Sequence, residues 1–240
     1  MNDERIKVIF LDIDGVLNST KTFKRIHEEY KKTGKRLPCI EDEYLDNLRE
    51  IINKTNAVIV LSSSWRHDFN FIHGELVPCE YIEDTKELYN GLCLRGIKLY
   101  DKTGTFPNKD NTYHSWRERE IEEWLNEHQN VESFVVIDDE KFDLSTYEKM
   151  NRLVYTRKDG EAIGLTKEYV NKAIDILNEP IKEEISNDCG DIILVAIYIL
   201  TFVFCILCSI ALINSYTTVP ALDTLILLIL LIIIRYLIQK

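Results

Sequence analysis

The chain has 240 residues, of which 45% are hydrophobic and 29% are charged, and its formal net charge at pH 7 is −11. This length allows one sizeable hydrophobic core and an additional segment. The charged residues beyond position 190 cancel (Asp191, Asp223, Arg235 and Lys240), so the excess negative charge belongs to residues 1–190. Because affinity for long nucleic acids comes mainly from basic residues, we expect no strong binding to long nucleic acid.

The first predicted strand, Lys7 to Leu11, is apolar and is followed by Asp12, Asp14 and Gly15. A strand that is buried on both faces offers no partner to such charges, so a cation is expected beside them. Residues two apart in a strand point to the same side, and both carboxylates can therefore reach the crevice beyond the strand's carboxyl end. One of them can attack phosphorus while the other handles a proton. The run thus predicts a metal and phosphate site.

Positions 21–36 follow this turn and hold seven basic and two acidic residues. This basic stretch could attract a phosphorylated substrate or anionic lipid headgroups. Phe23, Ile26 and Tyr30 form a helical stripe within it, which favours equally an amphipathic helix with a solvated basic face.

Strand and helix signals then alternate, which indicates an α/β fold with a mostly parallel sheet in three layers. Further strands are predicted at Ala57–Leu61, Gly96–Tyr100, Ser133–Ile137 and Arg152–Tyr155. Helices are predicted at Glu43–Lys54, Trp116–Glu127 and Thr166–Leu177, with Thr166 as a candidate N-cap. The segment from His67 to Tyr113 is rich in polar and turn residues and predicts only a minimal cap over the site.

The second strand is followed by three serines, then by Trp65 and Arg66. A hydroxyl at a strand end can donate to a phosphate oxygen, and Ser62 and Ser63 are the candidates. The alternative is that these serines cap the next helix. Trp65 is interpreted as a packing residue, whereas Arg66 can pair either with substrate phosphate or with a neighbouring carboxylate.

The strand at Ser133–Ile137 ends in adjacent carboxylates, Asp138 and Asp139, with Asp143 four positions further on. Carboxylate oxygens suit a hard cation such as Mg²⁺, which takes few protein carboxylates and keeps several waters. A turn is the alternative interpretation of an Asp-Asp pair. Together with the first motif, however, the pair favours a metal site.

These motifs resemble those of the haloacid dehalogenase (HAD) superfamily of aspartate-nucleophile phosphotransferases: DIDGV from Asp12, Ser62, and DDEKFD from Asp138. More narrowly, LDIDGVLN, LSSSWR, RxxEIxxWL from Arg117, IDDE and GLT look like the HAD domain of multi-domain RNA-repair proteins, over roughly residues 5–178. The resemblance implies a HAD-type, Rossmann-like three-layer fold with a minimal cap.

The resemblance also implies roles. Asp12 would be the nucleophile and Asp14 the acid and base, while Asp12, the backbone carbonyl of Asp14 and Asp138 would bind Mg²⁺, and Asp139 would act directly or through water. Ser62 would hold the phosphoryl oxygens.

The third motif of the superfamily is a basic residue that offsets the charge on the nucleophile and the phosphoryl group. Arg117 is the best candidate, at the start of the helix WREREIEEWL, and Lys109 and Arg119 are its competitors.

Residues 192–213 carry no charge and are long enough to cross a bilayer as a helix. A second crossing is predicted at 219–238, where Asp223 and Arg235 lie near the ends and can reach the interfaces. The basic residues beyond it favour a cytoplasmic C-terminus, and the N-terminus has no export signal. The sequence therefore predicts a multi-pass membrane protein whose catalytic domain, residues 1–178, faces the cytoplasm and is joined to the membrane by an acidic linker, residues 179–191.

The predicted function is a membrane-anchored, Mg²⁺-dependent phosphomonoester hydrolase. Because no large cap insertion is present, its open site would admit a small molecule, a nucleic-acid end or a phosphoprotein. The alternative is a membrane-tethered protein that binds a phosphate ligand without turnover, although the presence of Asp14 favours the enzyme, since a binder needs no acid or base.

Overall fold

The computed structural model describes residues 4–105, 117–141 and 144–181. Residues Met1–Ile181 form one compact unit. Both predicted membrane segments, most of the predicted linker, Lys109 and Asp143 lie outside the described residues. Within the described part of the chain, no helix is both long enough and apolar enough to cross a membrane.

The centre of the fold is a five-stranded parallel sheet with the order β5-β2-β1-β6-β7. Its strands are β1 (Ile6–Leu11), β2 (Val58–Leu61), β5 (Leu99–Lys102), β6 (Val131–Asp138) and β7 (Leu153–Tyr155). All five predicted strands are confirmed. The predicted start of β5 at Gly96 is wrong, because Gly96 has a φ of 67° and belongs to the turn that ends the preceding helix.

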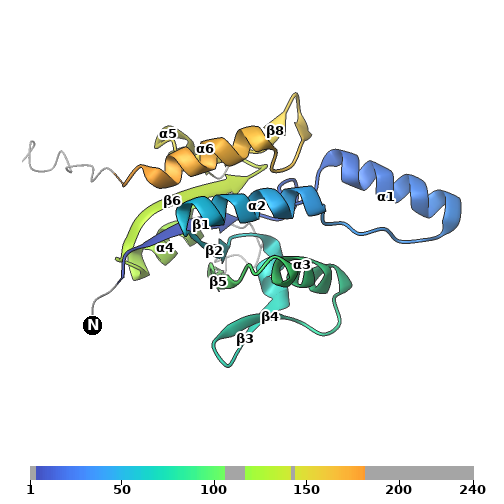
Figure 1. The fold of residues 1–240 in the computed structure, drawn as a ribbon, viewed down its shortest axis with the longest axis horizontal. Helices are drawn as coiled ribbons and strands as arrows, with labels where there is room; N and C mark the ends of the chain where they lie inside the picture. The colour runs from blue at the N-terminus through green and yellow to red at the C-terminus, as the bar shows by residue number, and fades with distance from the viewer. Residues whose placement is uncertain (1–3, 106–116, 142–143, 182–240) are drawn as a thin grey trace, which may run out of the picture. The chain divides into compact units, whose positions relative to one another are not determined.

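Helices cover both faces of the sheet, which confirms the three-layer α/β prediction (Figure 1). On one face lie α2 (Asp42–Thr55), α3 (Glu83–Leu94) and α6 (Lys167–Asn178), and on the other lie α4 (Arg117–Glu127) and α5 (Ser145–Lys149). The predicted helices correspond to α2, α4 and α6. Thr166 is the N-cap of α6, although its side chain makes no capping hydrogen bond. The sequence pattern does not predict α3 or α5.

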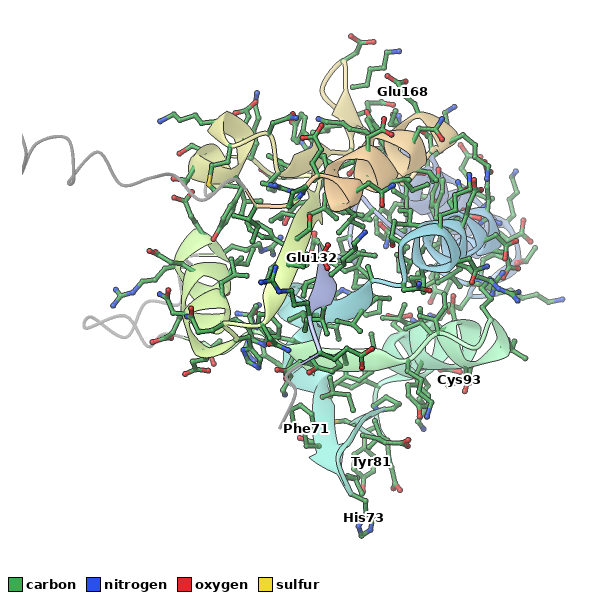
Figure 2. The ribbon with its side chains drawn as sticks, turned by 60° about the vertical axis from the view of Figure 1, so that its left-hand side comes forward. Phe71, His73, Tyr81, Cys93, Glu132 and Glu168 are labelled. Carbon is green, nitrogen blue, oxygen red and sulfur yellow. The ribbon has the colours of Figure 1, made fainter. Side chains whose placement is uncertain are left out.

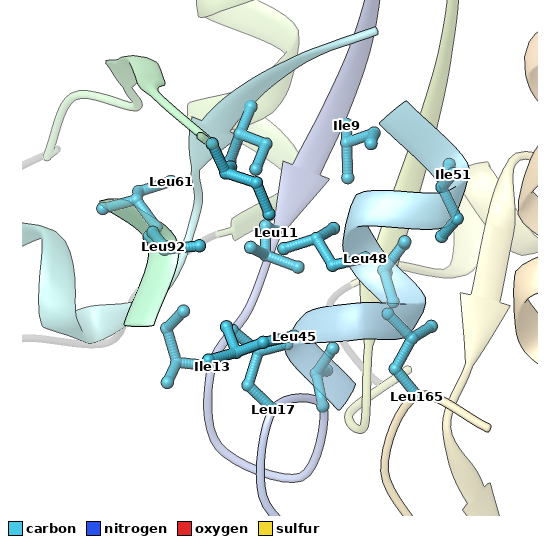
Figure 3. Packing of buried hydrophobic residues seen from close by; sticks show 14 of the residues in the cluster. Ile9, Leu11, Ile13, Leu17, Leu45, Leu48, Ile51, Leu61, Leu92 and Leu165 are labelled. Carbon is cyan, nitrogen blue, oxygen red and sulfur yellow. The ribbon is translucent and has the colours of Figure 1, made fainter. Parts of the chain in front are cut away.

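The central strand β1 is continuously apolar because both of its faces are covered. Ile9 and Leu11 pack with residues of α2 such as Leu48, as Figure 3 shows, whereas Val8 and Phe10 face the α4 side. These four strand residues are fully buried. A charged residue at the end of such a strand therefore has no water to solvate it, which makes the strand ends the informative positions of the fold.

The connection from β2 to β5 contains the short helix η1 (Ser64–Asp68), a hairpin of β3 (Phe69–Ile72) and β4 (Glu75–Pro78), and then α3. Figure 2 shows Phe71 and His73 on the outer part of this hairpin. Helix α3 buries Leu88 and Leu92 in the core. The segment predicted to be rich in turns therefore contributes a core helix as well as a hairpin.

The basic stretch forms α1 (Thr20–Thr33), which extends away from the sheet in Figure 1. Ser19 and Thr22 form a capping box at its start, and Gly34 closes it in the left-handed conformation. Thr22 is its one buried residue, and Ile26 packs against the core. The predicted helix is thus confirmed, but only Ile26 of its predicted apolar stripe packs against the core, because Phe23 and Tyr30 are exposed on the part of α1 that leaves the sheet.

Candidate active site

Three strand ends bring the separate sequence motifs to one edge of the sheet. Leu11 pairs with both Leu61 and Ile137, so the carboxyl ends of β1, β2 and β6 are neighbours. The backbone N–H of Asp12 donates to the carbonyl of Ile137, and that of Ser62 donates to the carbonyl of Leu11, both at 3.0 Å. We call this edge the catalytic edge. It is where open parallel sheets place their ligand sites.

The carboxylates of Asp12, Asp138 and Asp139 form a buried cluster at the catalytic edge. They are 5%, 0% and 8% exposed, and each offers an oxygen that lies within 4.8 Å of the others. Burial raises the pKa of Asp12, although Arg117 opposes the shift. Burial and the charge of Asp12 raise the pKa of Asp138 to about 7. Crowded, buried oxygen donors of this kind fit a hard divalent cation such as Mg²⁺.

Arg117, the first residue of α4, brings a positive charge to this cluster. Its Nη1 lies 3.4 Å from Oδ1 of Asp12 and donates a short hydrogen bond to Oδ2 of Asp138. Burial alone lowers the pKa of Arg117, but Asp12 and Asp138 outweigh burial and raise it above its ordinary value. The competing residue Arg119 is exposed. The structure therefore brings the predicted third-motif residue to the predicted nucleophile.

Asp14 is held by two neutral donors. Nδ2 of Asn18 donates to Oδ1 of Asp14 at 3.0 Å, and Nε1 of Trp65 donates to Oδ2 at 2.9 Å. Trp65 packs against the core as predicted, but it also makes this polar contact, which the sequence interpretation misses. Asn18 is fully buried and is a second missed residue. Its position three residues after Gly15, typical of a side chain that closes a turn, was the available signal.

Gly15 is required by the close approach of Asp139. Its φ is +73°, and a Cβ added there would lie 2.3 Å from Cγ of Asp139. The turn is fixed on both sides, since the N–H of Gly15 donates to Oδ1 of Asn18 at 2.7 Å and its carbonyl accepts from Oγ1 of Thr156 at 2.9 Å. A residue with a side chain would displace Asp139 from the cluster.

The serines after β2 divide between two uses. The side chain of Ser63 accepts a hydrogen bond from the backbone N–H of Trp65 and caps η1, so the capping alternative holds for this residue. Ser62 is fully buried, and its Oγ has no hydrogen-bond partner within the described residues. Leaving a buried hydroxyl unpaired is costly, so this orphan group is available for a ligand oxygen.

Arg66 pairs with a carboxylate, one of its two predicted alternatives. It is 2% exposed, and its Nη2 donates to Oε1 of Glu120 at 2.6 Å. Glu120 is a third residue that sequence reasoning misses, because nothing in the spacing of 54 positions indicates the pair. Arg157 is a fourth: its Nη2 lies 2.9 Å from Oδ2 of Asp139.

Taken together, an Asp-x-Asp turn on the central strand, an acidic pair on the neighbouring strand and an arginine between them define an α/β domain of the HAD class. Residues 8–170 match the family described as the HAD domain in Swiss Army Knife RNA repair proteins, and the chain belongs to this family. Membership confirms the HAD part of the predicted resemblance and supports a hydrolase of the phosphatase type. No curated protein and no solved structure matches the chain.

Proposed function

We propose that the chain is a Mg²⁺-dependent phosphomonoester hydrolase that forms an aspartyl-phosphate on Asp12. The observation that carries the proposal is the contact of Arg117 with Asp12 and Asp138 at the catalytic edge. A carboxylate nucleophile must be ionised, and the positive charge of Arg117 beside it favours that state although Asp12 is buried.

The reaction then takes two displacements at phosphorus. In the first, an oxygen of Asp12 forms a bond to phosphorus while the ester P–O bond breaks, and Asp14 gives a proton to the departing alcohol. In the second, water attacks the same phosphorus and loses a proton to Asp14, and the Asp12–phosphorus bond breaks. Inorganic phosphate leaves, and both carboxylates return to their initial states.

The residues proposed to hold Mg²⁺ are Asp12, Asp138, Asp139 and the backbone carbonyl of Asp14. When bound, the cation would reduce the repulsion between the carboxylates and the anionic phosphoryl group. Asp139 is also paired with Arg157, so one of its oxygens is already engaged, and action through a water molecule fits this residue best.

Ser62 and Arg117 are the proposed phosphate-binding residues, and Ser63 and Arg66, which the sequence predicts for the same role, are proposed to support them. The unpaired Oγ of Ser62 can donate to a phosphoryl oxygen, and Arg117 can stabilise charge on the phosphoryl group as the bonds exchange. Ser63 caps η1 and its side chain also hydrogen-bonds to Asp12, while Arg66 pairs with Glu120, so the proposed contribution of both is to hold the site in place rather than to bind phosphate directly.

The proposed substrates are a small phosphomonoester, a phosphorylated nucleic-acid end or a phosphoprotein. The family description refers to RNA repair, which supports inclusion of nucleic-acid ends. Helix α1 follows the catalytic turn directly and is basic, so it favours approach of an anionic substrate despite the acidic body.

We also propose that the chain is anchored in a membrane by residues 192–213 and 219–238, with the catalytic domain in the cytoplasm. The support is the apolar composition and length of these segments. Accessibility labelling of a single cysteine placed at Lys240 in sealed vesicles tests the topology, because protection from the cytoplasmic side would contradict it.

Turnover is tested with a panel of phosphate esters that includes small nucleotides and oligonucleotides carrying 3′- or 5′-phosphates. We expect hydrolysis of at least one member, its loss in EDTA, and its loss in Asp12→Asn. Asp175→Asn, at an exposed position on α6, is the matched control and should retain full activity. Unchanged hydrolysis in Asp12→Asn would overturn the nucleophile assignment. Metal-dependent phosphate binding without turnover on any ester would favour the non-catalytic alternative.

A further inference from the structure

The ion pair between Arg66 and Glu120 lies next to the phosphate-binding residues but touches no reacting group. Both side chains are 2% exposed, and Nη2 of Arg66 lies 2.6 Å from Oε1 of Glu120. The pair is incompletely satisfied, because Nε of Arg66 and Oε2 of Glu120 have no hydrogen-bond partner within the described residues. Removing two charges from water costs free energy that such a pair recovers only with excellent geometry and complete hydrogen bonding. Stability alone therefore does not account for it.

Each partner of this pair is fixed to a different side of the proposed phosphate pocket. Nη1 of Arg66 donates to the backbone carbonyls of Ser62 at 3.2 Å and of Ser63 at 2.9 Å. The backbone carbonyl of Arg66 in turn accepts from Nζ of Lys102 at 3.0 Å, which fastens η1 to β5. The Arg66 side of the pair is thereby joined to Ser62, the residue that follows β2.

On the other side, Glu120 lies three residues after Arg117 in α4, and residues with this spacing occupy the same face of a helix. Arg117 reaches the cluster of Asp12 and Asp138 from this face. The pair therefore adds a direct contact between η1, which follows β2, and the face of α4 that carries Arg117.

We propose that Arg66 and Glu120 are positioning residues that fix the distance between Arg117 and Ser62, the two groups proposed to hold phosphoryl oxygens. This inference rests on the proposed function, because it assigns the pair to the same phosphate site. It predicts that the pair contributes to phosphate binding and turnover far more than to folding. A shift of about 1 Å in a positioned group can reduce the rate by about a hundredfold.

The decisive variant is the double substitution Arg66→Met with Glu120→Leu. Replacement of both partners by apolar side chains of similar volume leaves no unpaired charge and is often neutral or stabilising for the fold. Because the carbonyls of Ser62 and Ser63 lose the Arg66 donor, we expect a melting temperature close to that of the wild type rather than above it. We also expect a dissociation constant for inorganic phosphate in Mg²⁺ that rises at least tenfold by calorimetry, and a kcat for p-nitrophenyl phosphate that falls at least tenfold. Arg95→Met is the matched control, since Arg95 also joins two helices by ion pairs, to Asp42 and Asp46. Its phosphate affinity should stay within twofold of the wild type.

Glu120→Asp is the second variant, because it keeps the charge and shortens the side chain by one methylene group. We expect a kcat at least threefold lower together with a lower melting temperature, because the shortened carboxylate leaves Arg66 imperfectly paired. Glu120→Gln keeps the length and still accepts a hydrogen bond but leaves Arg66 without a counter-charge, so it should also lower the melting temperature while retaining more of the rate. Wild-type phosphate affinity and kcat in either the double variant or Glu120→Asp would overturn the inference. Absence of turnover in the wild type, with phosphate binding retained, would overturn the proposed hydrolase alone. A wild-type protein that binds no phosphate would overturn both.

Discussion

The indole N–H of Trp65 donates to Oδ2 of Asp14 at 2.9 Å, although the two residues are 51 positions apart in the chain. Asn18 donates to the other oxygen of the same carboxylate. An indole nitrogen can only donate, so Trp65 fixes the orientation of the Asp14 carboxyl group. Trp65, which the sequence predicts to be a packing residue, therefore orients Asp14, the proposed acid and base.

Replacement of Trp65 by Phe should lower kcat without unfolding the protein. The ring still packs, but one hydrogen bond to a charged group is lost, which is worth about 1.5–3 kcal/mol and corresponds to a rate reduction of roughly tenfold to a hundredfold. Steady-state kinetics with the ester that the wild type hydrolyses fastest measures this reduction in kcat. Trp124→Phe is the control: it removes an indole hydrogen bond to Asp101 in the core and should reduce the melting temperature rather than kcat. Equal kcat in Trp65→Phe and the wild type would contradict the assignment.

Gly15→Ala should be more damaging than Gly34→Ala. Both glycines have a positive φ, +73° and +69°, so the backbone strain is matched. Gly34 has no atom within 4 Å of an added Cβ, whereas at Gly15 the Cβ would collide with Asp139. We expect a loss of about 1 kcal/mol in the free energy of unfolding for Gly34→Ala, and a further loss together with weaker Mg²⁺ binding for Gly15→Ala. Calorimetric titration with Mg²⁺ distinguishes the two variants. Equal Mg²⁺ affinities in Gly15→Ala and Gly34→Ala would contradict the predicted collision with Asp139.

Removal of the Arg117 charge should affect catalysis more than removal of the Arg119 charge. Arg117→Met leaves Asp12 and Asp138 without their shared cation, and loss of one preorganised electrostatic group costs about a hundredfold to a thousandfold in kcat. Arg119 is exposed on the same helix, so Arg119→Met should change kcat less than threefold. The ratio of the two kcat values decides between the two candidates for the third motif. A larger loss in Arg119→Met would reverse the assignment.

The metal-free protein should lose stability as pH rises towards neutrality. The pKa of Asp138 is raised from 3.8 to about 7 in the folded state, first by burial and then by Asp12. Between these values the folded protein keeps a proton that the unfolded chain has lost, so the free energy of unfolding falls with rising pH, by at most about 1.4 kcal/mol per pH unit for one group.

Thermal unfolding in EDTA at pH 5, 6 and 7 measures how the free energy of unfolding depends on pH. Subtracting the pH dependence of Asp138→Asn from that of the wild type isolates the contribution of the Asp138 carboxyl group. Added Mg²⁺ should flatten the wild-type dependence, because a cation favours the ionised carboxylate. Identical pH dependence in the wild type and Asp138→Asn would show that Asp138 titrates normally.

Most of the sheet could be predicted because its strands are apolar runs between polar ends. The continuous apolar run at β1 and the serines after β2 are local signals of a strand and its end. The alternation of strand and helix signals along the chain predicts that neighbouring strands run parallel, as they do. Helix α3 could not be predicted in this way. Its buried face is narrow, with Thr85, Leu88 and Leu92 as its buried residues, so its apolar pattern is weak against the polar residues around it.

The acidic residues at the strand ends could likewise be predicted as site residues, since a buried carboxylate such as Asp12 or Asp138 needs a partner that an apolar strand does not provide. The partners that orient them could not. Glu120 and Arg157 form ion pairs with residues 54 and 18 positions away, and such pairs depend on how helices and hairpins pack rather than on any local spacing. Sequence thus indicates the candidate reacting groups, and the fold shows which side chains hold them in place.

The chain leaves the folded domain at the edge opposite the reacting groups. Arg152 is nearly buried and donates to the carbonyls of Ile176, Glu179 and Pro180, while the N–H of Ile181 donates to the carbonyl of Glu132 near the start of β6. Six residue steps along β6 separate Glu132 at this exit from Asp138, a span of about 20 Å. The residues after position 181 are therefore attached where hydrogen bonds of Arg152 and Ile181 hold the end of the domain, far from Asp138. Changes in the residues that follow position 181 should therefore leave the geometry of the carboxylate cluster unaltered.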